Sequence, residues 1–485
     1  MLFSIILISV FLVGMVGIGV WGMKKTTTLG DFFLGGRTIG PWVSAFAYGT
    51  TYFSAVLFIG FAGKLGWGYG WNVLWIAAGN TLIGTLAAWL VLGRRTRRMT
   101  HNLDALTMPE FFFERFQAKG LKILSALIIF VFLIPYSASV FKGLGHMFQI
   151  NFNISYDVAL LIMTVITGIY LILGGYFAIT LTDFIQGLIM IVGAIALVAV
   201  MTMKGGGPEQ VFATMAQNYP AHIPPEKQPS LLMLGALVFM TSFGVWGMPQ
   251  MVQKFYAIKD EKMIFRAAIV TTVFSFIIAG AAYFNGALTH LFFKAPIMGA
   301  KGPAFDQMIP EMLKANLPPS LMGVVLLLVL SASMSTLSSL VLVSSSSVAI
   351  DLYKGHVNPK VSKETSLVMM RFLSAVFVGF SFFIAKYELA IIVTLMSLSW
   401  GAIAGSFMAP FLYGLYWKRT SAAGIYAGMI VGLSVSVGLF YYWGAAKSPL
   451  AASVGMIVPF LVVPLVSWFT PAPPREIVNK AFAGI

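Results

Sequence analysis

Apolar runs of roughly 20 residues, each long enough to cross about 30 Å of hydrocarbon, recur along the chain from Leu2 to Phe469. Charged residues make up 10% of the chain and the mean hydropathy is +0.88, whereas an average soluble domain has about 25% charged residues. A water-soluble protein of this composition could not cover its own surface. We therefore expect an all-α integral membrane protein that lies mostly inside the lipid bilayer.

Breaks at Pro, Gly and charged residues divide this apolar sequence into thirteen candidate transmembrane helices. They lie near residues 2–22, 41–65, 70–93, 121–149, 155–175, 179–203, 230–255, 265–293, 319–350, 366–386, 389–416, 422–444 and 448–470. The polar connections and the tail are too short for an enzymatic or signalling domain. We expect the membrane-embedded helices to carry the function.

The basic residues predict how the helices are oriented. If the N-terminus lies outside, all but nine of the 31 Lys and Arg residues fall in inner loops. The nine others are Lys64, Lys142, Lys204, Lys227, Lys294, Lys301, Lys314, Lys386 and Lys447. The positive-inside rule then predicts a multi-pass protein of the cell (inner) membrane, with its N-terminus outside and its C-terminus in the cytoplasm. The net charge of +15 reflects these loops, so we expect no nucleic-acid partner.

Two candidate helices have small and polar residues at their centres. The run from Ala47 to Ser54 interrupts the helix at 41–65, and the run from Thr241 to Pro249 interrupts the helix at 230–255. Such runs indicate unwound backbone that lines a cavity, although small-residue packing between helices is the alternative. The second broken helix follows the first by five helices, and this odd spacing is typical of inverted repeats.

The helix at 319–350 carries the most specific polar pattern. Ser335, Ser338 and Ser339 share one face, and Thr336 lies beside them. Hydroxyl and carbonyl oxygens are hard ligands that suit a small hard cation. The alternative is that these hydroxyls bond to carbonyls of their own helix and serve as small packing residues.

Asp183 lies inside the candidate helix at 179–203, whereas the other acidic residues fall in loops or at helix ends. A carboxylate inside a membrane span costs several kcal/mol unless it is paired or faces a polar cavity, and it therefore indicates function. The alternative is an interfacial residue, because Asp183 is about one turn from the predicted cytoplasmic end.

Three motifs together resemble the sodium:solute symporter family over nearly the whole chain. They are Leu34-Gly-Gly-Arg-Thr-Ile-Gly40, the Gly-Gly…Thr-Asp-x-x-Gln run at 174–186, and Ser335-Thr336 in a helix that ends Asp351-Leu-Tyr-Lys354. The resemblance implies the leucine-transporter fold, with two inverted five-helix repeats. We expect an extra N-terminal helix and basic loop at 1–40, repeats at 41–203 and 230–417 joined by an outer loop at 204–229, and two C-terminal helices with a short tail at 418–485.

The resemblance also implies two Na⁺ sites. The main site would use the backbone carbonyls of Thr50, Phe53 and Ala332 and the hydroxyls of Ser335 and Thr336. A second site, described for some members, would use Asp183, Ser338 and Ser339, with Thr182 as a further ligand. These residue types permit two Na⁺ ions without proving them.

The resemblance leaves the solute open. Members that carry proline have an acid and aromatic residues at positions that read Tyr52, Val56, Thr241 and Val245 here, which argues against a proline site of that kind. The two broken segments look more like those of pantothenate symporters, and they are also similar to monocarboxylate carriers. The residues expected to face the solute are Thr51, Tyr52, Ser54, Ala55, Tyr136, Ser139, Thr241, Ser242, Trp246, Ser397 and Trp400. Lys142 either attracts a carboxylate or extends toward the membrane surface.

The sequence thus predicts a secondary transporter and not an enzyme. We expect a symporter, functional as a monomer, that imports a small organic solute with Na⁺ by alternating access. A carboxylate such as pantothenate or a monocarboxylate is the first expectation, and proline or another amino acid is the alternative. Proton coupling and a transport-like sensor rank lower.

Overall fold

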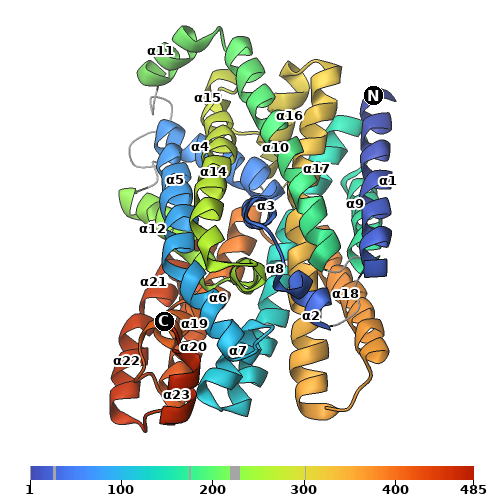
Figure 1. Cartoon of the computed structure of the whole chain (residues 1–485). Coiled ribbons are helices and arrows are strands. Elements are labelled where there is room, and N and C mark those ends of the chain that lie inside the picture. The colour runs from blue at the N-terminus through green and yellow to red at the C-terminus, as the bar shows by residue number, and fades with distance from the viewer. Residues whose placement is uncertain (1, 26–28, 174–175, 219–229, 301) are drawn as a thin grey trace.

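The computed structural model describes residues 2–25, 29–173, 176–218, 230–300 and 302–485. Almost all of this part of the chain is helical (Figure 1). Its one named sheet is the antiparallel pair β1 (Met298–Gly299) and β2 (Gly302–Pro303). Part of the expected outer loop, 219–229, and Gly174 and Gly175 of the second motif lie outside the described residues.

The helices follow one another in the order that the apolar runs predict. Short 3₁₀ and π segments are labelled η. The first half contains α1 (Leu2–Lys25), α2 (Leu29–Leu34), η1 (Gly35–Arg37), α3 (Pro41–Tyr52), η2 (Val56–Phe61), α4 (Ala62–Tyr69), η3 (Gly70–Val73), α5 (Leu74–Gly79), η4 (Asn80–Ala87), η5 (Trp89–Gly93), α6 (Arg94–Asn102), α7 (Met108–Phe116), α8 (Lys119–Phe152), α9 (Tyr156–Leu173), α10 (Tyr176–Lys204) and α11 (Pro208–Asn218). The second half contains α12 (Leu231–Phe243), η7 (Gly244–Gly247), α13 (Pro249–Ala257), η8 (Glu261–Met263), α14 (Ile264–Ala287), α15 (Thr289–Phe292), α16 (Phe305–Asn316), α17 (Pro319–Ser346), η9 (Ser347–Val357), α18 (Lys363–Lys386), α19 (Ile392–Tyr416), α20 (Ala422–Trp443), η10 (Ala445–Lys447), α21 (Ser448–Ile457), α22 (Pro459–Phe469) and α23 (Arg475–Ala481).

The number of membrane spans differs from the prediction, whereas the positions of the helices agree with it. Each of the thirteen predicted stretches contains helix. By length and hydropathy, ten helices of the described chain could cross a membrane, or eleven if the bent pair α12 and α13 counts as one span. The two counts differ because α3 ends after 12 residues and the apolar part of α9 is short. The predicted count of thirteen is therefore not confirmed.

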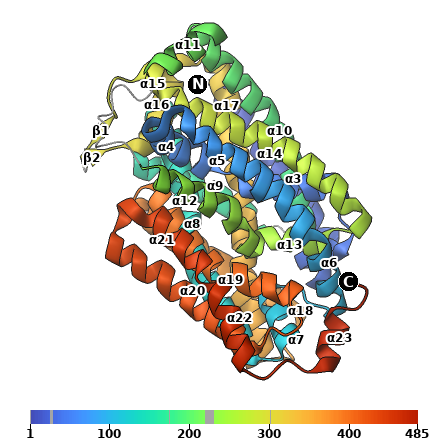
Figure 2. The ribbon, with the colours of Figure 1, turned by 90° about the vertical axis from the view of Figure 1, so that its left-hand side faces the viewer.

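Two helices form the centre of the bundle. In the most apolar 18-residue stretch of α17 and η9, 94% of the residues are buried, and the same share is buried in α19. In the corresponding stretch of α1 only 28% are buried. Figure 1 shows α1 at the edge of the bundle, and Figure 2 shows α20, α21 and α22 on one flank beside α19. The hydroxyl-rich helix of the sequence is thus surrounded by protein on all sides.

Both predicted helix breaks are present. After α3 ends at Tyr52, Phe53 is extended, with φ −112° and ψ 122°, before the chain becomes helical again at η2. After η7, Met248 is extended, with φ −85° and ψ 119°, and the chain bends by 48° into α13. Pro249 explains the second break, because proline lacks an N–H group and disfavours helical backbone at the residue before it. We call residues 50–55, which include the last turn of α3, the first break, and residues 244–248 the second break.

Backbone contact between α4 and α14 fixes the outer half of the first broken helix. A Cβ atom added at Gly66 would lie 2.2 Å from the carbonyl carbon of Gly286, and one added at Gly286 would lie 2.5 Å from the carbonyl oxygen of Ala62. Small residues allow helix backbones to approach this closely, and dispersion contacts then replace the missing side chains.

A Gly286→Ala substitution should therefore destabilise the protein, because the added methyl group pushes two backbones apart. Overpacking of this kind costs about 1–3 kcal/mol. The matched control is Gly280→Ala on the same helix, where an added Cβ meets nothing within 4 Å. Thermal unfolding in detergent should show a lower midpoint for Gly286→Ala alone. Equal midpoints for the two variants would contradict the close packing.

Candidate functional site

The first break lies against α17 along three successive polar contacts. The hydroxyl groups of Thr51 and Ser339 form a hydrogen bond of 3.0 Å. The Thr336 hydroxyl lies 3.1 Å from the Thr51 carbonyl oxygen and 3.3 Å from that of Thr50. The Ala55 amide donates to the Ser333 hydroxyl at 3.2 Å. The serines and threonine of α17 thus bind the backbone that the break releases from helical hydrogen bonding.

Several oxygen atoms of the predicted main Na⁺ site converge at Thr336. Its hydroxyl also lies 3.1 Å from the carbonyl oxygen of Ala332. A hydroxyl has one proton, so it can donate to only one of these three carbonyls at a time. The Ser335 hydroxyl is buried and makes no hydrogen bond of ordinary geometry within the described chain, although it lies near enough to the Asp183 carboxylate to interact with it. Unpaired buried oxygen atoms beside clustered carbonyls are the environment that a small hard cation would complete.

Among the predicted main-site residues, the structure brings together Thr50, Ala332 and Thr336 by direct contacts. Thr51 joins them, although it was predicted to face the solute. Ser335 adjoins Thr336 on α17, and Phe53 is the extended residue of the break. The roles of Phe53 and Ser335 as Na⁺ ligands stay predictions.

A buried lysine lies beside the residues of the predicted second Na⁺ site. Asp183 of α10 is fully buried, which excludes an exposed interfacial position. Lys254 of α13 reaches this carboxylate, with 3.7 Å between Nζ and Oδ2, and donates to the Ser339 hydroxyl at 3.0 Å. Lys254 is itself 1% exposed. The Lys254 ammonium group therefore contacts two of the four predicted ligands of the second site, Asp183 and Ser339.

Two further predicted ligands of the second site are hydrogen-bonded elsewhere. The Ser338 hydroxyl donates to the Ser335 carbonyl of its own helix at 2.8 Å. The Thr182 hydroxyl lies 2.8 Å from the Ile179 carbonyl and 2.5 Å from the Tyr170 hydroxyl. Both follow the alternative in which hydroxyls bond to their own helix. The roles of these four residues as Na⁺ ligands stay predictions.

The placement of Lys254 corrects the orientation analysis, which counted this residue among the inner-loop cations. Lys254 is buried on a half-helix inside the bundle. The sequence held a signal for this position, because Lys254 follows the helix break by only five residues and still belongs to the apolar stretch 230–255. Helix α13, which begins at Pro249, directs the Lys254 side chain toward Ser339 of α17.

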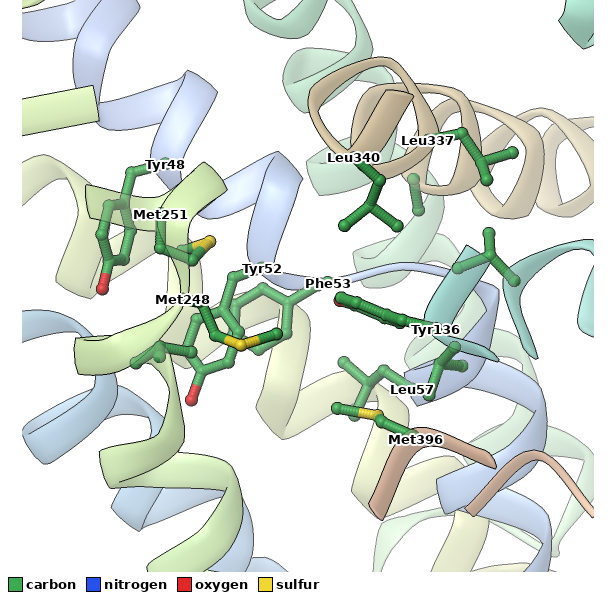
Figure 3. Close-up of a cluster of buried hydrophobic side chains, with 14 of the residues drawn as sticks. Tyr48, Tyr52, Phe53, Leu57, Tyr136, Met248, Met251, Leu337, Leu340 and Met396 are labelled. Carbon is green, nitrogen blue, oxygen red and sulfur yellow. The ribbon is translucent and has the colours of Figure 1, made fainter. Parts of the chain in front are cut away.

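A small cavity lies beside the first break, against α8, α12, α14 and α19. It has a volume of about 20 Å³, about enough for one water molecule. Figure 3 shows Tyr52 and Phe53 of the first break between Met248 of the second break and Tyr136 of α8. The complete lining is Tyr52, Phe53, Ser54, Val56, Leu57, Phe61, Asn80, Tyr136, Thr241, Tyr283, Met396 and Trp400.

Five of the residues expected to face the solute line this cavity. They are Tyr52, Ser54, Tyr136, Thr241 and Trp400. Tyr52 also joins the two broken helices, because its hydroxyl donates to the Thr241 carbonyl at 2.5 Å. Its ring stacks on that of Trp400, with centroids 6.3 Å apart.

The other predicted solute residues outside the main site have different partners. The hydroxyls of Ser139 and Ser397 donate to carbonyls of their own helices at 2.6 Å and 2.7 Å. Ser242 lies 3.3 Å from the Asn80 side-chain oxygen, and Trp246 donates to the Ile83 carbonyl at 3.1 Å. The Ala55 amide binds Ser333. None of these five is among the residues that line the cavity.

The sequence analysis missed Asn80 and Tyr283, two polar lining residues. Asn80 was detectable as an amide near the centre of the apolar stretch 70–93. Tyr283 gave no such signal, because an aromatic residue in an apolar helix is typical of ordinary packing.

Lys142 follows neither of its two predicted roles. Its ammonium group lies 2.9 Å from Asp306 Oδ2 and 3.4 Å from Glu388 Oε1, and His146 binds the same Glu388 oxygen at 3.1 Å. Glu388 belongs to the loop between α18 and α19. The hydrogen bond from His146 lowers the pKa of Glu388 to about 2, so this group stays ionised at neutral pH. Lys142 is a member of an ion-pair cluster.

The first of the three motifs has a structural explanation. Gly35 and Gly36 adopt φ values of 56° and 62°, a region that glycine enters without steric cost. This turn directs the Arg37 guanidinium to the carbonyl oxygens of Ala105 at 2.8 Å and Tyr256 at 3.2 Å. The motif therefore ties the start of α3 to the ends of α6 and α13.

Comparison with known proteins agrees with this fold. The model of the sodium:solute symporter family matches residues 32–432. The osmoregulated proline transporter OpuE of Bacillus subtilis is 30% identical over 476 residues, which cover 97% of this chain and 96% of that protein. The sodium/proline symporter of Haemophilus influenzae is 32% identical over 438 residues, which cover 88% and 86%. The chain belongs to the sodium:solute symporter family.

Solved structures confirm the leucine-transporter fold. A Na⁺-coupled sialic acid symporter in a substrate-bound outward-open state superposes with a TM-score of 0.81 at 19% identity, covering 98% of this chain and 99% of that one. Mhp1, a nucleobase-cation-symport-1 family transporter in a closed conformation, gives a TM-score of 0.57 at 13% identity, with coverages of 93% and 97%. The predicted family and fold class are thus confirmed, and the protein is a sodium:solute symporter.

Thr336→Ala should raise the Na⁺ concentration for half-maximal uptake about tenfold or more, because it removes an oxygen ligand of a charged group, worth on the order of 1.5–3 kcal/mol. Solute affinity at saturating Na⁺ should change far less. Ser345→Ala is the matched control on α17, because the Ser345 hydroxyl donates to Val341 of its own helix. Uptake by proteoliposomes over a range of Na⁺ concentrations measures both. An unchanged Na⁺ dependence in Thr336→Ala would remove the proposed site.

Proposed function

We propose that this symporter imports a small amino or imino acid of about the size of proline, together with Na⁺, by alternating access. The observation that carries the proposal is that one stretch of backbone borders both sites. Thr50 and Thr51 of this stretch contact Thr336, and the next three residues line the cavity. An ion that orders this stretch also positions the wall of the solute cavity.

The cavity suits a solute with little net charge. The residues that line it include no Asp, Glu, Lys or Arg. Thr241 near the C-terminal end of α12 lines this cavity, and so do Ser54 and Val56 at the N-terminal end of η2. Helix C-termini favour cations and N-termini favour anions. The two helix ends therefore provide complementary surroundings for the amino and carboxylate groups of a zwitterion.

The cavity must enlarge before it admits such a solute, because its present volume is about 20 Å³. Tyr52, Tyr136 and Trp400 form its aromatic walls, and the ring centroids of Tyr136 and Trp400 are 5.9 Å apart. We propose that these rings separate in the solute-bound conformation. Coupling requires that Na⁺ bind this conformation more tightly than the others, since an ion that bound all equally could shift none of them.

The relatives support proline as the first solute to test, because the curated proteins named above are proline transporters. They give no support to the preference for pantothenate or a monocarboxylate. One observation nevertheless keeps a monocarboxylate as a second candidate. The Tyr52 hydroxyl already donates to the Thr241 carbonyl, which an amino group would otherwise use, and a solute without an amino group needs no such acceptor.

The energy available from one Na⁺ is substantial. A monovalent ion that moves down a membrane potential of about 100 mV contributes roughly 2.3 kcal/mol, which corresponds to about fifty-fold accumulation of a neutral or zwitterionic solute. A chemical Na⁺ gradient adds to this.

Uptake of radiolabelled proline into proteoliposomes should depend on external Na⁺ and should fall to the leak level when K⁺ replaces Na⁺ at fixed pH. Unlabelled proline should compete strongly, whereas lactate and pantothenate should compete weakly. Liposomes without protein provide the leak level. Strong competition by lactate alone would favour a monocarboxylate as the solute. Uptake that persists in K⁺ but follows a proton gradient would contradict Na⁺ coupling.

A further inference from the structure

The ammonium group of Lys254 is buried inside the bundle. It is not one of the groups that form the main Na⁺ site. We propose that Lys254 is a covalently attached cation that occupies the second ion site, so that this protein binds and couples one Na⁺ per transport cycle. This inference rests on the main Na⁺ site of the proposed function, which would hold that single ion.

The position of Lys254 follows from the second break. The bend of 48° before α13 turns this half-helix toward α10 and α17. Lys254 then donates to Ser339 at 3.0 Å, lies 3.7 Å from Asp183, and has its ammonium 5.2 Å from the centre of the Tyr176 ring. A carboxylate, a hydroxyl and an aromatic face are typical surroundings of a buried cation.

The single carboxylate of Asp183 balances the charge of one cation. Asp183 and Lys254 are 0% and 1% exposed. A buried carboxylate requires a counter-charge, and Lys254 supplies it. A second Na⁺ at Asp183 would face the Lys254 ammonium with a single carboxylate between them. Like-charge repulsion and the loss of the Ser339 hydroxyl as a ligand would both oppose its binding.

The same contacts connect Lys254 with the main site. Lys254 binds Ser339, and Ser339 binds the Thr51 hydroxyl. The Thr51 carbonyl contacts Thr336. Lys254 therefore joins the second broken helix to the first through α17, and a mobile Na⁺ at its position would have to be bound and released in every cycle.

Equilibrium binding of ²²Na⁺ to the purified full-length protein tests the inference. We expect one bound ion per wild-type molecule. Lys254→Gln should bind two, because Asp183 and Ser339 then lack their cation. Lys254→Gln combined with Asp183→Asn should return to one. Lys254→Arg should also bind one, because it keeps the charge. Lys122→Gln is the matched control, a buried lysine that pairs with Glu110 and Asp351 elsewhere, and it should leave the wild-type value unchanged.

The possible failures can be told apart. Two ions bound to the wild type would overturn the role of Lys254 and leave the main site intact. No ion bound to the wild type would contradict the main site, and with it the single-ion stoichiometry. One ion bound to a folded Lys254→Gln protein would also overturn the proposal. If Lys254→Gln does not fold, the numbers of Na⁺ ions bound by the wild type and by Lys254→Arg test the proposal, which requires one ion in each.

Discussion

The contact of the Thr336 hydroxyl with the backbone of the first break is the interaction on which the rest of the site depends. A helix that unwinds inside a bilayer leaves carbonyl and amide groups without their usual partners, and water is not there to replace them. Here α17 provides the partners at Ser333, Thr336 and Ser339. The break persists because it is buried in protein, and the carbonyls that it releases are the oxygen atoms a small cation needs.

This arrangement gives a physical meaning to coupling. The backbone that contacts α17 at Thr50 and Thr51 continues directly into the residues that line the solute cavity. Any ligand that fixes one end of so short a segment restricts the other end. Lys254 extends the same contacts to the second broken helix, and its charge requires no release during the cycle. In this view the protein keeps one cation permanently and exchanges the other.

The sequence predicted the parts of this structure that depend on local chemistry. Long apolar runs predicted the helices, and both breaks were predicted from the small and polar residues around Thr50 and before Pro249. The hydroxyl face of α17 was predicted because residues three and four apart share a helix face. The membrane-span count was not confirmed, since a broken helix such as α3 and η2 has no single length.

Other features depend on how distant helices pack, so sequence patterns alone do not show which residues meet. Lys254 was assigned to a loop, and only the bend at the second break brings it to Asp183, 71 positions earlier in the sequence. Asn80 and Tyr283 reach the cavity from helices that carry no motif. Ser338 and Thr182 have the right residue types for a Na⁺ site, but their hydroxyls bond to other groups.

The central claim is that Na⁺ and the solute act on one segment of backbone. Isothermal titration of the purified protein with proline, at several fixed Na⁺ concentrations, tests it most directly. We expect Na⁺ to raise the affinity for proline by a factor of about 5–150, and proline to raise the affinity for Na⁺ by the same factor, because binding linkage is reciprocal. A proline affinity that is measurable and does not change with Na⁺ would contradict it.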